Sequence, residues 1–403
     1  MNLARLAAEA AANGTPVRAA LIGAGKFGSM FLSQVPTIAG LEVTAIADLD
    51  PDRARTACTT VGWDDTRIAA TAFTDDGAAA LARDDVDVVI EATGNPRAGI
   101  RHARAAMAAG KHIVMVNVEA DVLLGPVLAA EARAAGFSVA AAGKGTKYLP
   151  SYHSVTPDEV WSHYGLTPEE AARAGMNPQM FNSFLDGTKS AIEMVAIANA
   201  CGLDVPRKGL LFPPCGVDDL AHILRPRDLG GVLDGNGMVE AVSSLERDGR
   251  PVFRDLRWGV YVVLEAPNDY AAACFRQYGL PTDATGRFAS MYKPFHLIGL
   301  ELSISVLSAA LRGEPTGSTR EARGTVAAVA KRDLKAGEIL DGEGGYTVWG
   351  RACPVAQGRE ALPIGLAHGI PLTTDVPAGT ALTFADVELG DDPIAAEYRA
   401  SLA

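Results

Sequence analysis

A glycine-spaced turn constrains this chain more than any other feature. An apolar run from Ala19 feeds Gly23, Gly25 and Gly28, and a segment with helical spacing follows. In a strand-turn-helix unit these glycines allow a sharp turn, close approach of the backbone to a phosphate, and tight helix-strand packing. The free N–H groups at the helix start also favour an anion. The pattern predicts a dinucleotide cradle, with an ordinary glycine-rich turn as the alternative. The predicted cofactor contacts are Gly23, Gly25, Lys26, Phe27 and Gly28.

A second apolar run, residues 41–47, ends at Asp48, about twenty positions after the glycines. A carboxylate there would accept hydrogen bonds from adenine-ribose hydroxyls and repel a 2′-phosphate, which favours NAD. Arg53 is close enough to receive that phosphate instead, so NADP stays open. Asp48 would otherwise cap the next helix, and Asp50 with Pro51 offers the same cap.

The first 142 residues alternate apolar runs with Ala-, Leu- and Arg-rich segments. The runs at 86–91, 112–115 and 137–141 suit buried parallel strands. Crossover helices are expected at 53–60, 77–83, 97–109 and 121–135, after a short helix at the start. We therefore expect an α/β fold with a doubly wound sheet over residues 1–142. Further cofactor contacts are expected where strands end, at Thr93, Gly94, Asn117 and Glu119.

Composition excludes several classes of protein. The chain has 403 residues and a formal net charge of −12, which argues against a nucleic-acid partner. No apolar run reaches the roughly 18 residues needed to span a bilayer. The five cysteines are scattered without a Cys-x-x-Cys pair, as expected for reduced, buried thiols of a cytoplasmic protein. The Ala-rich start lacks the pattern of a signal peptide.

The composition of the chain changes after Ala142. Residues 143–150 are polar, doubly basic and broken by glycine, so we expect a loop at the rim of the substrate site, with Lys144 in a catalytic role and Lys147 contacting the substrate. Helices at 168–174 and 189–201 and a strand at 259–265 predict an α+β substrate domain over residues 143–325.

The densest polar group in that region runs from Asn182 to Glu193. Asp186 or Thr188 can cap a helix, on which Lys189 and Glu193 lie one turn apart and close enough to pair. A lysine whose pKa is lowered in a dry cleft can move the proton that accompanies hydride transfer, so Lys189 is the predicted proton shuttle. Asp186 is a further catalytic candidate, and Thr188 and Glu193 are predicted substrate contacts. A solvated surface ion pair is the alternative for Lys189.

Lys293 and His296 flank Pro294, a plausible first helical residue. Their charges would gather at a helix start that favours anions, and we expect them to hold a substrate carboxylate or phosphate. The sequence shows no metal motif, although Mg²⁺ held by Asp186, Glu193 or Glu119 stays open.

The last region, residues 326–403, contains an internal repeat. Asp333–Leu340 and Asp375–Leu382 share the pattern Asp-φ-x-Ala-Gly-x-x-Leu, which predicts a small all-β module with pseudo-symmetry after a linker at 316–321. A chance match between two short turns is the alternative.

Three phrases, at 186–194, 292–301 and 330–337, resemble the homoserine-dehydrogenase-like oxidoreductases that end in a SAF domain, a group that includes deoxyxylulose-phosphate-reductoisomerase-like enzymes. The resemblance implies an NAD(P)-binding domain, a central catalytic and oligomerisation domain, a C-terminal β-clip and hence a homo-oligomer. Two features depart from that group. The catalytic lysine region of true homoserine dehydrogenases has no counterpart here, and a strand-helix unit with Gly-Asp-Gln-Pro is missing before Phe137.

The sequence therefore predicts an NAD(P)-dependent oxidoreductase that acts on a small, anionic hydroxy or oxo compound. Lys189 would move the proton. Lys144, Lys293 and His296 would contact the substrate through their positive charges. The alternatives are a reductoisomerase that needs a divalent ion, and a sensor or assembly protein that binds NAD(P) without turnover.

Overall fold

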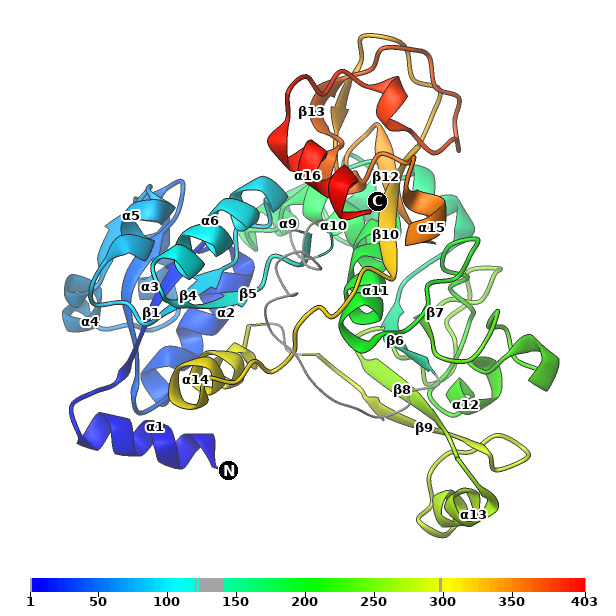
Figure 1. Cartoon of the computed structure of the whole chain (residues 1–403), viewed down its shortest axis with the longest axis horizontal. Coiled ribbons are helices and arrows are strands. Elements are labelled where there is room, and N and C mark those ends of the chain that lie inside the picture. The colour runs from blue at the N-terminus through cyan, green and yellow to red at the C-terminus, as the bar shows by residue number, and fades with distance from the viewer. Residues whose placement is uncertain (1, 120–121, 123–140, 297–298, 403) are drawn as a thin grey trace. The chain divides into compact units, whose positions relative to one another are not determined.

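A computed structural model of the chain describes residues 2–119, 122, 141–296 and 299–402. The described chain divides into two compact units, and each is described by itself (Figure 1). Unit 1 comprises Met1–Asp121 with Leu297–Ser318, and unit 2 comprises Val122–His296 with Thr319–Ala403. The expected domain boundaries near residues 142 and 325 stay predictions.

The described part of unit 1 is built on a five-stranded parallel sheet in the order β3-β2-β1-β4-β5. Residues of β1 alternate between two cores: Leu21 packs with Phe31 on one face, and Ile22 packs with Ala80 on the other. Because both faces are covered, the strands read as continuous apolar runs. The doubly wound sheet is confirmed. Its strands are β1 Val17–Ile22, β2 Leu41–Ala47, β3 Ala72–Thr74, β4 Val88–Glu91 and β5 His112–Met115.

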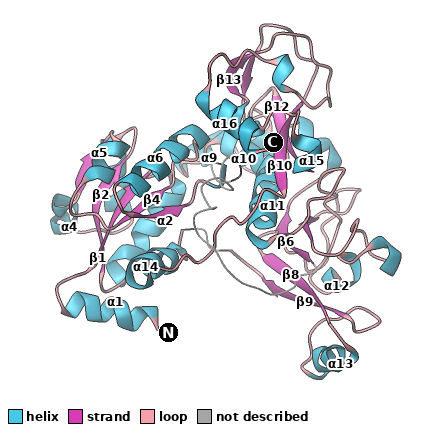
Figure 2. Cartoon of the chain, in the orientation of Figure 1, coloured by secondary structure: helices cyan, strands magenta, loops and turns pink. Residues whose placement is uncertain are grey.

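The helices of unit 1 follow the expected crossover pattern (Figure 2). The segment expected as a helix at 121–135 and most of the strand expected at 137–141 lie outside the described residues. The elements are α1 Leu3–Ala12, α2 Lys26–Gln34, η1 Val35–Thr37, α3 Pro51–Thr60, α4 Asp65–Ala70, α5 Gly77–Ala82 and α6 Pro96–Ala108.

One helix joins unit 1 from much later in the chain. Helix α14, Leu302–Arg312, packs against α1, α2 and the strands β1, β4 and β5. Its Val306 and Leu307 are buried in the same core as Phe31. The sequence did not predict this packing, because nothing local marks which sheet a distant amphipathic helix covers.

Unit 2 contains a four-stranded mixed sheet in the order β7-β6-β8-β9. Strand β6 runs parallel to β7 and antiparallel to β8, and β8 pairs antiparallel with β9. Helix α11, Thr188–Cys201, packs against β6 and β7, and also against β10, Gly324–Ala330, and β12, Val348–Pro354, of the C-terminal region. The strands are β6 Ala141–Thr146, β7 Met238–Ser243, β8 Val260–Glu265 and β9 Phe288–Lys293. The other helical segments are η2 Pro150–Ser154, α8 Val160–Tyr164, α9 Pro168–Arg173, α10 Pro178–Leu185, α12 Leu220–Ile223, η3 Arg227–Leu229 and α13 Asp269–Gln277.

The expected loop after Ala142 is wrong for its first half, because Gly143, Lys144 and Gly145 lie within β6. The reason is steric. A Cβ at Gly143 would collide with the carbonyl oxygen of Glu240, and a Cβ at Gly145 would collide with that of Leu256. The glycines thus permit close backbone approach inside a sheet, which the sequence pattern does not distinguish from a loop.

The C-terminal region of unit 2 shows the expected repeat as a reciprocal contact. Leu334 and Val376 exchange backbone hydrogen bonds of 2.9 and 3.0 Å. The Asp333 carboxylate accepts from the N–H of Ala378 at 2.9 Å, and the Asp375 carboxylate accepts from that of Ala336 at 3.0 Å. The two turns are therefore related by a local pseudo-two-fold. The elements are β10 Gly324–Ala330, β11 Ile339–Asp341, β12 Val348–Pro354, α15 Val355–Gly358, η4 Ile364–Leu366, β13 His368–Pro371, η5 Phe384–Asp386 and α16 Pro393–Ser401.

Candidate active site

The glycine loop of unit 1 has the geometry of a phosphate cradle. Gly23 lies at φ +99°, and a Cβ there would be 2.6 Å from the carbonyl oxygen of Ala92. A Cβ at Gly28 would be 2.5 Å from the carbonyl oxygen of Gly23, whereas one at Gly25 would have no neighbour within 4 Å. Helix α2 begins at Lys26, and no side chain caps its N-terminus. The open space at Gly25 beside uncapped N–H groups fits a pyrophosphate.

Asp48 follows β2 and lies beside this loop. Its carboxylate accepts from the N–H of Ala24 at 2.8 Å and from the N–H of Asp50 at 3.0 Å, and it forms an ion pair with Arg53 at 2.5 Å. Burial alone would raise the pKa of Asp48, but these bonds outweigh it and hold the pKa below its usual value. Asp48 is therefore ionised at neutral pH. It already pairs with Arg53, the guanidinium that would otherwise receive the 2′-phosphate of NADP. The helix cap of α3 falls to Asp50.

A polar network surrounds the buried Glu91 at the carboxyl end of β4. The Thr93 hydroxyl donates to Glu91 at 2.6 Å, and Nδ1 of His102 lies 3.1 Å from the same oxygen. Asn117 donates from Nδ2 to the carbonyl oxygen of Asn95 at 2.8 Å. The sequence predicted Thr93 and Asn117 here but missed Glu91 and His102. The only sequence signal was the carboxylate of Glu91 at the end of an apolar strand. Of the other predicted contacts, Gly94 lies at φ +69° with open space at its Cβ position, and Glu119 is buried.

In unit 2, two predicted site residues from distant segments come together. Lys144 of β6 forms an ion pair with Glu193 of α11, and its ammonium lies 5.4 Å from the Phe184 ring centroid. Lys189 is half-buried one turn before Glu193 on the same helix. The sequence predicted Lys144 and Glu193 separately and did not predict that they would form a pair.

Asp186 and Thr188 are fully buried at the start of α11. The Asp186 carboxylate accepts from the N–H of Thr188 at 2.9 Å and pairs with Lys331 at 2.8 Å. Lys331 also donates to the carbonyl oxygens of Val155 and Gly345 at 2.8 and 2.7 Å. Burial raises the pKa of Asp186, and Lys331 opposes that rise. Thr188 accepts through its hydroxyl from the N–H of Gly350 at 2.8 Å. This geometry favours a structural role for both residues, joining α11 to the C-terminal strands.

Lys147 follows β6 directly and lies in a cationic cluster. Its ammonium donates to the carbonyl oxygen of His163. Burial and the nearby Arg257 guanidinium lower the pKa of Lys147, and burial and Lys147 lower the pKa of His163. Arg257 lies over the rings of Trp258 and Tyr164, at 4.6 and 5.8 Å from their centroids. The sequence predicted Lys147 but missed His163 and Arg257, which come from other segments.

The expected helix start at Pro294 is wrong. Lys293 is the last residue of β9, and α14 begins only at Leu302. His296 is exposed and its N–H donates to the carbonyl oxygen of Trp258 at 2.8 Å. A proline that follows an edge strand gives the same sequence signal as one that opens a helix. Lys293 and His296 therefore have no helix N-terminus to reinforce their charge.

Three further findings concern the described residues alone. They contain no group of three or more His, Cys, Asp or Glu side chains that could hold a metal ion. No helix among them is both long and apolar enough to cross a membrane. All five cysteines are free thiols, and Cys201 is exposed, contrary to the expectation that all are buried.

The parallel sheet, the open glycine cradle and the ionised Asp48 define unit 1 as a Rossmann-type dinucleotide-binding unit. Residues 17–116 match the model of the GFO/IDH/MocA oxidoreductase family, NAD-binding Rossmann fold. Residues 127–302 match the model described as oxidoreductase DRL, catalytic domain. Both matched models describe oxidoreductases, and the model that covers residues 17–116 describes an NAD-binding unit.

Solved structures give weaker similarities. A homoserine dehydrogenase from Thiobacillus denitrificans matches at 21% identity and TM-score 0.25, over 28% of this chain and 26% of that one, so the chain spans about a quarter of its length. Homoserine dehydrogenase from S. aureus matches at 17% identity and TM-score 0.40, over 75% of this chain and 77% of that one. A scyllo-inositol dehydrogenase from Lactobacillus casei matches at 10% identity and TM-score 0.37, over 76% and 92%. Similarities this low carry no inference about substrate. A search of curated protein sequences finds no significant match.

Proposed function

We propose that the chain transfers a hydride between NAD and a small hydroxy or oxo compound that carries a negative charge. The observation that carries the proposal is the ion pair between Lys144 and Glu193, with Lys189 one helical turn away. Lys144 comes from β6, and Lys189 and Glu193 lie one turn apart on α11. A lysine fixed by Glu193 can contact the negative charge of a substrate, and a lysine one helical turn away can transfer the proton.

Each of these side chains has a distinct role in the proposal. Lys189 moves the proton to or from the substrate oxygen, while the bound cofactor supplies or accepts the hydride. Glu193 holds the Lys144 ammonium in place, and Lys144 contacts the substrate oxygen or its anionic group. Lys147 is the second candidate for the proton shuttle, favoured by its lowered pKa. Lys293 and His296 are exposed and remain further candidates for the substrate anion.

The preference for NAD rests on Asp48. Its carboxylate faces the glycine loop through the N–H of Ala24, and Arg53 is held by the same carboxylate. A 2′-phosphate would need Arg53 to leave Asp48 and would meet the negative charge that remained. NADP is therefore expected to bind more weakly than NAD.

Turnover of a panel of hydroxy acids, oxo acids and sugar phosphates with NAD(H) tests the assignment of Lys189. The Lys189→Met variant should lower kcat by about 10²- to 10⁴-fold, the usual contribution of a positioned acid or base. Lys147→Met is the matched comparison, and NADH binding measured on both variants separates chemistry from cofactor affinity. Unchanged kcat in Lys189→Met with a large loss in Lys147→Met would move the role to Lys147.

A reductoisomerase is the second candidate, favoured by the resemblance of residues 186–194 and 292–301 to that group. It would couple a carbonyl or carbon-skeleton shift to hydride transfer and need a divalent ion. Loss of activity on chelation, restored by Mg²⁺ or Mn²⁺, would favour it. A chain that binds NADH but turns over no compound of the panel would instead favour a sensor.

We also propose that residues 326–403 form a SAF-type β-clip and that the chain is a homo-oligomer. The reciprocal turns of Asp333 and Asp375 support the first proposal. Light scattering of the purified chain tests the second, since a mass of one chain, 42.0 kDa, would contradict it.

A further inference from the structure

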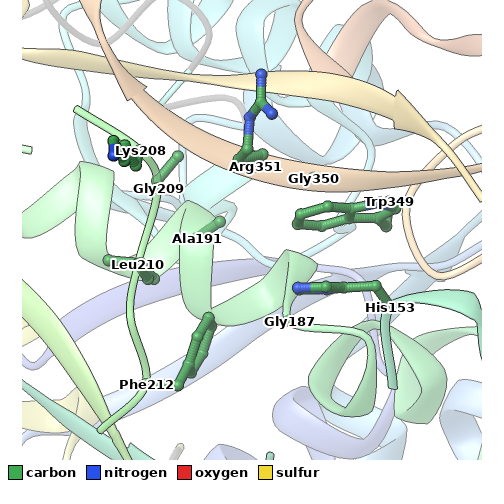
Figure 3. A pocket seen from close by; sticks show the side chains of 11 residues that line it. His153, Gly187, Ala191, Lys208, Gly209, Leu210, Phe212, Trp349, Gly350 and Arg351 are labelled. Carbon is green, nitrogen blue, oxygen red and sulfur yellow. The ribbon is translucent and has the colours of Figure 1, made fainter. Parts of the chain in front are cut away.

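Unit 2 contains a small cavity between α11, the segment 208–212 and β12 (Figure 3). Its volume is about 70 Å³. Because one water molecule needs about 10–15 Å³ of such space, the cavity has room for roughly five or six non-hydrogen atoms. None of the residues assigned to hydride transfer above lines it.

Flat aromatic rings form two sides of the cavity. His153 stacks on Trp349 with ring centroids 3.6 Å apart, and Phe212 stacks on Tyr148 at 3.9 Å. Nδ1 of His153 lies 2.7 Å from the carbonyl oxygen of Asp186, so it must donate; Nε2 then accepts from the Tyr148 hydroxyl at 2.9 Å. Burial lowers the pKa of His153, which favours the neutral imidazole, and both ring nitrogens have hydrogen-bond partners, so the rings present apolar faces.

The Phe212 wall is held in an uncommon backbone conformation. Phe212 lies at φ +47°, a left-handed region that bulky residues rarely adopt. The fully buried Glu240 carboxylate accepts from the N–H of Leu211 at 3.0 Å and from that of Phe212 at 3.2 Å. A strained residue fixed in this way is a feature found at binding sites, because the surrounding structure must hold its shape before a ligand arrives.

Two cations lie at the rim, away from the stacked rings of His153 and Trp349 (Figure 3). They are Lys208 and Arg351, and no carboxylate lines the cavity. Within the part of the chain that the structure describes, neither forms an ion pair. Gly209, at φ +84°, brings the loop so close that a Cβ would lie 3.0 Å from Cγ of Arg351. The methylene groups of Arg351 are therefore packed against this loop. Its guanidinium forms no ion pair among the described residues.

We propose that this cavity binds a short-chain carboxylate, with the carboxylate between Lys208 and Arg351 and the carbon chain against the rings of Phe212 and Trp349. The site favours an anion because both rim charges are positive and no carboxylate lines the cavity. A carboxylate suits the site better than inorganic phosphate, since phosphate would place oxygens against apolar ring faces. The site is independent of the hydride chemistry proposed above.

Propionate, which has five non-hydrogen atoms, is the probe. The full-length chain is titrated while the Trp349 indole N–H resonance is followed, assigned by its absence in Trp349→Phe. A saturable shift with a Kd on the order of 1–10 mM is expected, the range of efficient fragments of this size. 1-Propanol and inorganic phosphate should each bind at least fivefold more weakly.

Lys208→Gln and Arg351→Gln remove the charges but keep most of each stem. Together they should raise the Kd for propionate at least tenfold. If the double variant does not fold, Lys208→Gln alone, at an exposed position, should raise the Kd severalfold. Arg359→Gln, an exposed arginine outside the cavity, is the charge-matched control and should leave the Kd unchanged. The proposal is overturned by a Trp349 resonance that does not saturate, by phosphate binding as tightly as propionate, or by charge variants that bind like the wild type.

Discussion

Removing the ammonium of Lys331 should destabilise unit 2 strongly. Lys331 and Asp186 are both almost completely buried and lie 2.8 Å apart, and the ammonium also donates to two backbone carbonyls. Lys331→Met keeps a stem of similar length but removes the positive charge beside a buried carboxylate and one donor from each of two backbone carbonyls. Breaking one side of a buried pair costs about 3–5 kcal/mol, and we expect a loss of that size in the free energy of unfolding.

The loss should depend on pH with a definite sign. Burial raises the pKa of Asp186, and Lys331 opposes the rise, so the variant should have a still higher pKa at this carboxyl. A carboxyl with a folded pKa above its unfolded value binds more protons when folded, so stability falls as pH rises from the unfolded pKa to the folded one. The deficit of Lys331→Met should therefore shrink on acidification towards the unfolded pKa of about 4.

Urea unfolding followed by circular dichroism measures both effects. Lys335→Met is the matched control, because Lys335 pairs with Asp375 at 2.7 Å on the surface and should leave the midpoint almost unchanged. Adding Asp186→Asn to Lys331→Met should recover part of the loss, since it removes the stranded charge. A loss below about 1 kcal/mol, or one that does not change with pH, would refute the reasoning.

Other predictions concern the cofactor and the C-terminal repeat. Asp48→Ala should weaken NAD binding about tenfold or more and reduce discrimination against NADP, because Arg53 is released; equal losses for both cofactors, measured by calorimetry, would contradict the assigned role. Asp333→Ala and Asp375→Ala each remove one of two equivalent carboxylate-to-backbone bonds. Their thermal midpoints should fall by similar amounts of a few degrees, and a large effect of one alone would show that the repeat is not energetically symmetric.

Local patterns predicted unit 1 well. The Gly23–Gly28 turn, the strand before it and the strand ending at Asp48 depend on short-range backbone geometry, which glycine spacing and apolar periodicity report directly. The doubly wound sheet followed because covered parallel strands are continuously apolar.

The wrong predictions concern glycine and proline, residue types that each occur in two different kinds of local structure. Gly143 and Gly145 looked like loop residues but sit inside β6, where a neighbouring carbonyl leaves no room for a Cβ. Pro294 looked like a helix start but follows an edge strand.

Contacts between distant segments carried no sequence signal at all. The Asp186–Lys331 pair and the packing of α14 onto the first sheet depend on tertiary structure, which neither periodicity nor composition encodes. Lys144 and Glu193 were each predicted, but their pairing required the structure to bring β6 and α11 together.

The proposed chemistry depends on a dinucleotide held by the Gly23–Gly28 loop. NADH fluorescence titration of Gly25→Val tests it most directly, with Gly235→Val as control. Both glycines have open space at the Cβ position and neither has a positive φ, so both variants should fold. We predict saturable NADH binding by the wild type and Gly235→Val, and loss of at least about 100-fold in affinity for Gly25→Val, because the side chain would fill the space for the pyrophosphate. Wild-type affinity in Gly25→Val would contradict this role of the loop.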